Sequence, residues 1–396
     1  MAGNQRTPIP SHTPRRGALS RRQFLKLAGL GLGGLALPAF GPAAPTARRV
    51  SAAAGEAYWL PDFPAGDRLA RVAVGMVDVK QRPDPDSATV GVLYEDAVLP
   101  WIHETSGVKP AYIFNSQRWV ETPQGYIYQP YLQPVYNRPN QPVEELPPSG
   151  RGPGMWVEVT VPYAEAVLDA AAPSSNSWVE AKLDQGLPLR VYYSQTFWID
   201  QVKKTESGRV LYRINPNFYG GVDLLWVDAA AFRPITASEL APINPDAVDK
   251  RIEVDVTHQT LACYEGQQEV YFCRVSTGAK YDMYGNLVDH WSTPVGKHRV
   301  TRKYISLQMA GGTTGAGYDL PGIAWTCIFA TGGVAIHSTF WHDNYGTPVS
   351  HGCVNCTPED SKWIFRWTSP EVIYDPGMLD VTVSGQDSTG VQVYES

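Results

Sequence analysis

Residues 251–278 carry the pattern that most restricts the fold of this chain, because apolar and polar side chains alternate through RIEVDVTHQTLACYEGQQEVYFCRVSTG. A period of two is typical of half-buried strands, and Glu265 and Gly266 mark a turn between two of them. The composition agrees: 21 Tyr, 12 Trp, 33 Pro and 36 Gly in 396 residues favour strands joined by tight turns over long helices. We therefore predict a mainly β protein.

Two stretches rich in proline, glycine and serine interrupt the alternating segments, at 137–154 and at 233–246. Such runs are typical of linkers, and the chain is long enough for two or three domains. The predicted division is a leader over 1–54, a β domain over 68–136, a linker over 137–154, a second β domain over 155–234, a third domain over 250–384 and a tail over 385–396.

The leader resembles an export signal. Ser20–Lys26, SRRQFLK, is a twin-arginine pattern, and the Gly-rich apolar run Leu27–Phe40 after it is too short to span a membrane comfortably. Ala52 and Ala54 offer a cleavage site. We expect the mature protein outside the cytoplasmic membrane, in the cell wall or the extracytoplasmic space. An uncleaved leader would be the only membrane anchor.

The charge balance bears on partners. A net charge of −6 lacks the excess of Lys and Arg that neutralises phosphate backbones. The sequence therefore predicts no nucleic-acid partner.

The five cysteines all lie in the last third of the chain. An odd number leaves at least one thiol unpaired, which in an exported protein needs an explanation. Cys263 and Cys273 flank a hairpin-like stretch, so they are either a cross-strand disulfide or two buried free thiols.

The segment Ile336–Cys356, IHSTFWHDNYGTPVSHGCVNC, concentrates residues that can do chemistry. A metal site is weakly indicated, since the single C-x-x-C has no second ligand pair at zinc-finger spacing. A redox dithiol is weakly indicated as well, because no βαβ pattern surrounds it. The third interpretation is a nucleophile, Cys353, with His337 as its base and with Gly352 allowing a sharp turn.

A helix is expected directly after the last cysteine. Thr357 can cap it, Pro358 suits its first position and Asp360 its third. Trp363, Ile364 and Trp367 would then share one face.

The same segment resembles the signature of the L,D-transpeptidase catalytic (YkuD) family, in which a histidine on a strand is followed by a loop and by Ser-His-Gly-Cys. Upstream, IEVDVTHQTLACYEG, VSTG, STPVGKHRV and DLPGIAWTCIFATGGVAIH match the family in order, and the resemblance covers about 250–384. It implies a β-sandwich whose groove lies under a mobile flap within residues 310–322, AGGTTGAGYDLPG.

The resemblance also implies roles for individual residues. Cys353 would be the nucleophile, His337 the base, and Ser338 would orient His337 through its backbone carbonyl. His351 and Gly352 would shape the oxyanion turn, and Asn355 would support the loop and the substrate. Aromatic residues that could line a groove for a peptide, although core packing explains them equally well, are Tyr318, Trp325, Phe340 and Trp341.

Three nearby side chains are given lesser roles. His342 and Asp343 are expected on a solvated loop rather than at the substrate. Cys356, where the family usually has an apolar residue, is expected to be a small buried hydrophobe.

Residues 68–136 resemble a bacterial Src-homology-3-like (SH3-like) domain of the cell-wall type, through VDVKQRPDPDSATVGVLYEDAVLPW and WVETPQGYIYQPYL. This resemblance is soft, and it implies a wall-binding module or a spacer. Residues 155–234 match less well and are interpreted as a degenerate copy.

Together the resemblances imply an enzyme that needs no metal and no cofactor. Cys353 would form a thioester with a peptidoglycan peptide stem, and an amine of a second stem would resolve it into a 3→3 cross-link. Carbapenems would acylate the same thiol. An L,D-carboxypeptidase, with water as the acceptor, and an inactive wall-binding protein are the alternatives.

Overall fold

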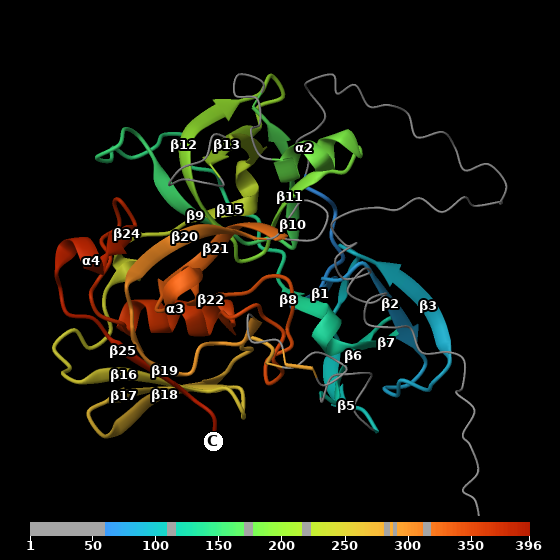
Figure 1. The fold of residues 1–396 in the computed structure, drawn as a ribbon. Helices are drawn as coiled ribbons and strands as arrows, with labels where there is room; N and C mark the ends of the chain where they lie inside the picture. Colours follow the sequence, from blue (N-terminus) through green and yellow to red (C-terminus); the bar gives the residue numbers. More distant parts are fainter. Residues whose placement is uncertain are drawn as a thin grey trace, which may run out of the picture.

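The computed structural model describes residues 60–108, 116–169, 177–215, 223–280, 286–287, 291–311 and 318–396. The leader over 1–54, and residues 312–317 of the segment expected to form a flap, lie outside these ranges. The described chain is mainly β, as predicted, and its strands fall into three units. In Figure 1 the first unit is blue to teal, the second is green, and the third runs from yellow to red.

The first unit contains two sheets. One has the order β4-β1-β8, and the other has the order β3-β2-β7-β6-β5. The strands are β1 Leu69–Val72, β2 Met76–Lys80, β3 Thr89–Tyr94, β4 Val98–Pro100, β5 His103–Ser106, β6 Arg118–Thr122, β7 Gly125–Tyr128 and β8 Leu132–Val135.

The second unit is one seven-stranded sheet of order β11-β10-β14-β13-β12-β9-β15. Its elements are β9 Met155–Val159, β10 Tyr163–Leu168, α2 Ser177–Asp184, β11 Leu189–Tyr192, β12 Thr196–Lys204, β13 Val210–Asn215, β14 Leu225–Asp228 and β15 Phe232–Pro234. Its sheet organisation differs from that of the first unit, so the relation between the two stays a prediction.

The third unit has two five-stranded sheets, ordered β18-β17-β16-β25-β19 and β23-β22-β21-β20-β24. The first sheet contains β16 Lys250–Asp255, β17 Thr260–Glu265, β18 Gln268–Arg274, β19 Gly296–Arg299 and β25 Gly390–Tyr394. The second contains β20 Arg302–Gly311, β21 Tyr318–Ile328, β22 Ala335–Ser338, β23 Val354–Cys356 and β24 Met378–Asp380.

Strand β25 corrects the expectation of a tail over 385–396. It pairs in parallel with β16 and antiparallel with β19, so it is an interior strand of its sheet. Val391 and Val393 point into the core. The alternation in GVQVY was the local signal for this strand.

Helix α3, Pro358–Trp367, forms where the sequence predicted it, with the Thr357 hydroxyl accepting a hydrogen bond from Asp360 N. Ile364 and Trp367 are buried, while Trp363 is partly exposed and stacks on Tyr271. Two other helices, α2 and α4 (Val381–Ser384), were not anticipated.

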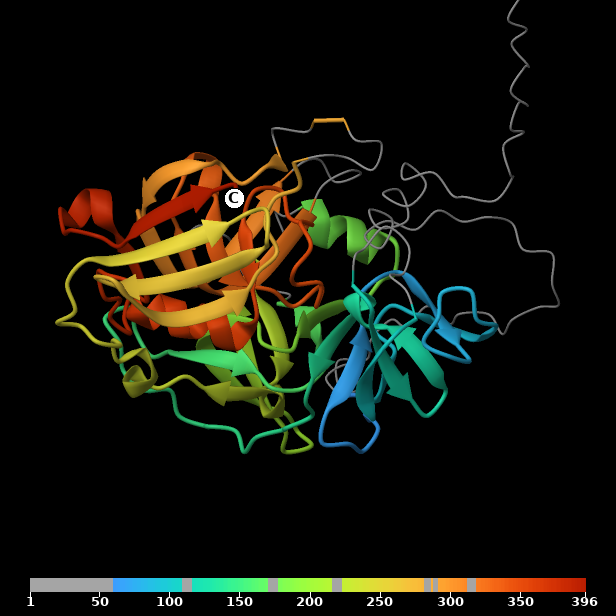
Figure 2. The same cartoon turned by 90° about the horizontal axis from the view of Figure 1, so that it is seen from below.

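The second and third units share a hydrophobic core. Trp156 and Trp198 of the second unit pack in the cluster that fills the third. Thr196 Oγ1 donates to Ile305 O at 3.0 Å, and Ser306 Oγ donates to Thr196 O at 2.6 Å. The two views agree that the green unit lies directly against the orange and red one (Figures 1 and 2).

Candidate active site

Cys353 and His337 are brought together by two neighbouring parallel strands. His337 lies on β22 opposite Asn355 of β23. Continuing that register by one residue sets Cys353 beside Ala335. Since side chains alternate along a strand, Cys353 and His337 point to the same face, one diagonal step apart.

His337 is held in one tautomer by the backbone. Its Nδ1 lies 2.8 Å from Ser338 O, and because a carbonyl can only accept, Nδ1 carries the proton and Nε2 has the free lone pair. Burial lowers the pKa of His337 to about 4, partly offset by this hydrogen bond. The imidazole is therefore a neutral base near pH 7.

The Cys353 thiol is also neutral near pH 7. Burial raises its pKa to about 11, and a hydrogen bond with the Ala335 backbone acts in the opposite direction. The pair therefore rests as thiol and imidazole, and the proton has to move when an acyl group arrives.

The turn before Cys353 is fixed by side-chain hydroxyls. Gly352 has φ 118°, a conformation that L side chains rarely adopt. Ser350 Oγ accepts from Gly352 N at 3.1 Å and donates to Cys353 O at 2.5 Å. Thr293 Oγ1 donates to Gly352 O at 2.8 Å and accepts from Gly278 N at 2.9 Å.

Sequence reasoning gave Ser350 no role, and Thr293 entered only as part of the matching stretch STPVGKHRV. A hydroxyl two residues before a glycine was the available signal for Ser350, since short Ser and Thr side chains often close local turns. His351, which lies between Ser350 and Gly352 in the chain, is exposed. The centroid of its ring is 5.0 Å from that of Trp291 and 6.0 Å from that of Tyr318.

The loop that follows His337 is buried, which corrects the expectation of a solvated loop. His342 is 8% and Asp343 7% exposed. His342 Nδ1 accepts from Asn344 N at 3.1 Å, and the Asn355 carboxamide lies 2.9 Å from Nε2. Asn355 thus contacts the loop. Burial lowers the pKa of His342 to about 3 and raises that of Asp343 to about 7, against the lowering effect of Arg118.

The four aromatic residues expected along a groove divide into two groups: Tyr318 and Trp341 are partly exposed, and Phe340 and Trp325 are buried. The Trp341 ring lies 5.9 Å from that of His337. Trp325 is 1% exposed and packs edge-on against Phe365 in the core, so its indole is not at a groove surface. Trp325 is buried because its side chain lies on the face of β21 that packs into the core.

All five cysteines are free thiols, so Cys263 and Cys273 do not form the disulfide considered above. Register is the reason, because Cys263 lies opposite Tyr271 and Cys273 opposite Leu261. Cys356 is buried, and its thiol donates to Val354 O at 3.9 Å. Among the described residues no group of three or more His, Cys, Asp or Glu side chains is arranged to hold a metal ion. No helix in the described ranges is long and apolar enough to cross a membrane.

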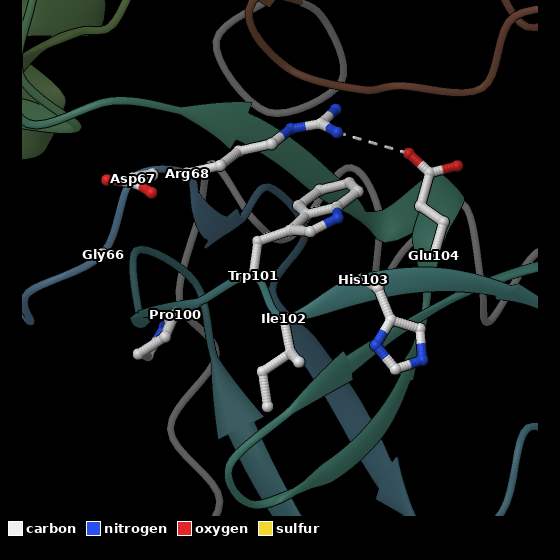
Figure 3. A pocket seen from close by; sticks show the side chains of 8 residues that line it. All are labelled: Gly66, Asp67, Arg68, Pro100, Trp101, Ile102, His103 and Glu104. Atoms are coloured by element: carbon white, nitrogen blue, oxygen red, sulfur yellow. Dashed lines mark ion pairs between the residues drawn. The ribbon is translucent and has the colours of Figure 1, made fainter.

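A separate cavity of about 450 Å³ lies in the first unit (Figure 3). The Arg68 guanidinium sits 4.0 Å from the centre of the Trp101 ring and pairs with Glu104 at 3.6 Å. The residues that line it are Gly66, Asp67, Arg68, Pro100, Trp101, Ile102, His103 and Glu104.

Residues 249–383 match the family model of the L,D-transpeptidase catalytic domain (YkuD). This part of the chain, which holds Cys353 and His337, is therefore an L,D-transpeptidase catalytic domain. No curated protein matches the chain.

Solved structures similar to the chain include L,D-transpeptidases of two organisms. The catalytic domain of the Enterococcus faecium enzyme is 22% identical, with a TM-score of 0.27, over 37% of this chain and 97% of that one. A mutant of the E. faecium enzyme is 23% identical, with a TM-score of 0.27, over 37% and 50%. The Mycobacterium smegmatis enzyme is 14% identical, with a TM-score of 0.29, over 49% and 98%. The chain thus spans about half the length of the E. faecium mutant.

Proposed function

We propose that this protein is a cysteine-dependent peptidoglycan L,D-transpeptidase that joins two peptide stems by a 3→3 cross-link. The observation that carries the proposal is the His337 tautomer. Nδ1 of His337 donates to Ser338 O, so Nε2 is the nitrogen that can accept a proton, and His337 lies on the strand next to the one that Cys353 precedes. Acyl transfer by a thiol needs such a base.

The proposed first step forms a thioester. Cys353 Sγ attacks the carbonyl before the terminal D-residue of a tetrapeptide stem, and its proton passes to His337 Nε2. The turn at Gly352 is the proposed place for the developing oxyanion. Collapse of the tetrahedral intermediate breaks the amide bond, and D-Ala leaves with the proton from His337.

The proposed second step releases the product. A side-chain amine of another stem attacks the thioester and gives its proton to His337, which returns it to Sγ. One amide bond is broken and one is formed, so the reaction needs no cofactor. Carbapenems, whose strained ring presents a similar carbonyl, would acylate the same sulfur.

Purified protein incubated with a defined disaccharide-tetrapeptide tests the proposal by mass spectrometry. We expect a cross-linked dimer and free D-Ala. A tripeptide alone would identify an L,D-carboxypeptidase, and no product would identify an inactive wall-binding protein. Cys353→Ala should form no product, and a carbapenem should add its mass to the wild type but not to this variant.

We also propose that the protein acts outside the cytoplasmic membrane, with residues 68–136 as an SH3-like module that contacts the cell wall. The twin-arginine pattern and the soft SH3-like resemblance support this location and this contact. Replacing Arg21 and Arg22 by Lys should leave the protein in the cytoplasm, as followed by cell fractionation. Export at the wild-type level would contradict the twin-arginine route.

A further inference from the structure

One residue of the loop after His337 is contacted by both N-terminal units. Arg71 of β1 donates from Nη2 to Phe340 O at 2.7 Å. The Phe340 ring stacks on Tyr192, at the end of β11, with centroids 5.7 Å apart and planes 13° apart. The Arg71 guanidinium also lies 4.3 Å from the centre of the Tyr192 ring. We call Arg71, Tyr192 and Phe340 the Arg71 clamp.

The Arg71 guanidinium is buried and uses all three of its nitrogens. Its side chain is 3% exposed. Nε donates to Gln133 Oε1 at 2.9 Å and Nη1 to Asp96 Oδ1 at 2.7 Å, besides the bond to Phe340 O. Because a buried guanidinium is costly unless its donors are satisfied, these bonds fix where Phe340 can lie.

A second contact holds the same loop a few residues further on. Gln129, which is fully buried in the first unit, donates from Nε2 to Asp343 Oδ2. Arg118 Nη2 lies 3.8 Å from the same carboxylate oxygen. The loop is therefore held by the first unit at both Phe340 and Asp343.

We propose that Arg71 is a positioning residue for the catalytic pair, acting through the Arg71 clamp, so that the first unit is part of the catalytic machinery. Phe340 lies two residues after Ser338, whose carbonyl receives the His337 proton. Trp341, directly after Phe340, packs its ring against His337. Fixing Phe340 therefore fixes the backbone and the ring that orient His337. This inference rests on the proposed function for its main measurement.

Three variants of the full chain separate positioning from simple stability. Arg71→Ala removes the clamp. Arg71→Lys keeps the positive charge but not the planar guanidinium whose nitrogens reach three partners. Arg190→Gln is the matched control, because Arg190 also pairs with Asp96, at 2.6 Å. Within the described part of the chain its guanidinium contacts Asp96, Glu165 and Tyr163, none of which belongs to the loop.

For Arg71→Ala we expect kcat for dimer formation, per folded and titratable Cys353, to fall by roughly 100-fold, the effect of a misplacement of about 1 Å. Arg71→Lys should lie between this variant and wild type. The kcat of Arg190→Gln should stay within about 3-fold of that of the wild type, even if its thermal stability falls as much as that of Arg71→Ala. Millimolar guanidinium should restore part of the kcat of Arg71→Ala and should not change the wild type.

Two results would overturn the inference. One is a kcat for Arg71→Ala equal to that of the wild type. The other is an equal loss in Arg71→Ala and Arg190→Gln, without rescue, because the loss would then follow stability alone. If Arg71→Ala does not fold, Arg71→Lys decides between the same outcomes.

A wild type that forms neither dimer nor tripeptide would refute the proposed function, and the inference would then be decided without substrate. The rate of Cys353 alkylation by iodoacetamide is measured against pH. If the clamp positions the loop over the pair, its loss admits water, and the midpoint for Arg71→Ala falls toward that of an ordinary thiol while Arg190→Gln keeps the wild-type midpoint. An unchanged midpoint in Arg71→Ala would overturn the inference.

Discussion

Cys353 and His337 form a pair in which both groups are held in their neutral forms. Burial does this to each of them, raising the pKa of the thiol to about 11 and lowering that of the imidazole to about 4. The pair therefore differs from a preformed thiolate and imidazolium, which would react rapidly at neutral pH.

The first prediction follows for the free enzyme. Because only the thiolate is alkylated, the rate at Cys353 should rise about tenfold per pH unit from pH 7 and level off only near the raised pKa. Iodoacetamide labelling with peptide mapping measures it, and Cys353→Ser is the blank. A plateau below pH 8 would instead show an ion pair.

Ser338 serves the site through its backbone, while its hydroxyl serves the fold. Ser338 Oγ accepts a hydrogen bond from the buried Ala324 N at 3.1 Å. We predict that Ser338→Ala lowers the free energy of unfolding by roughly 1–3 kcal/mol, because a buried N–H loses its acceptor. Its kcat per titrated Cys353 should stay near that of the wild type. A large loss of kcat at unchanged stability in urea would contradict this division of roles.

At the scale of elements, helix α3 supports the strands that carry the pair. It packs on β21 and β22 through Ile364 and Phe365, and its first turn depends on the Thr357 cap. We predict that Thr357→Ala costs about 1 kcal/mol in urea unfolding, while Thr357→Ser, which keeps the hydroxyl, costs little. Equal losses in the two variants would mean that the methyl group rather than the cap matters.

Residue alternation and capping residues in the sequence predicted the strands and the helix whose formation depends on neighbouring residues. Alternation gave the strands around 251–278, and Thr357 with Pro358 gave the start of α3. Strand β25 has a local signal in the alternation of GVQVY, but its place in the sheet could not be predicted, because it depends on parallel pairing with β16, far away in the chain. The burial of Trp325, similarly, is decided by what packs against β21 and not by its own neighbours.

At the scale of the whole molecule, the loop after His337 lies between units that are distant in sequence. No periodicity in 336–356 indicates that Asp343 meets Gln129 or that Phe340 meets Arg71. Sequence reasoning therefore proposed Cys353 and His337 as a pair, and the fold sets them on neighbouring strands, but it placed the loop between them in solvent. A loop buried in this way ties the titration of His342 to the stability of the protein.

We predict the sign of that pH dependence. The pKa of His342 is lowered to about 3 in the folded protein from an ordinary 6.5. The stabilising contribution of the neutral His342 imidazole to folding is therefore fully present above pH 6.5. It is lost as the pH falls, by up to about 1.4 kcal/mol of unfolding free energy per pH unit. The stability gap between wild type and His342→Gln should narrow between pH 6.5 and 4.5 in urea titrations. A gap that stays constant would contradict the prediction.

The bond between Arg71 and Phe340 joins residues 269 positions apart, and that between Gln129 and Asp343 spans 214 positions. Closing such long loops costs entropy before any contact repays it, so these bonds belong to late stages of folding. The order of events then follows from the fold: each sheet can form from nearer contacts, and the loop is fixed last. In a chain whose sheets have all formed but whose first unit has not yet docked, Cys353 and His337 would already lie on paired strands. The loop beside them would not yet be fixed.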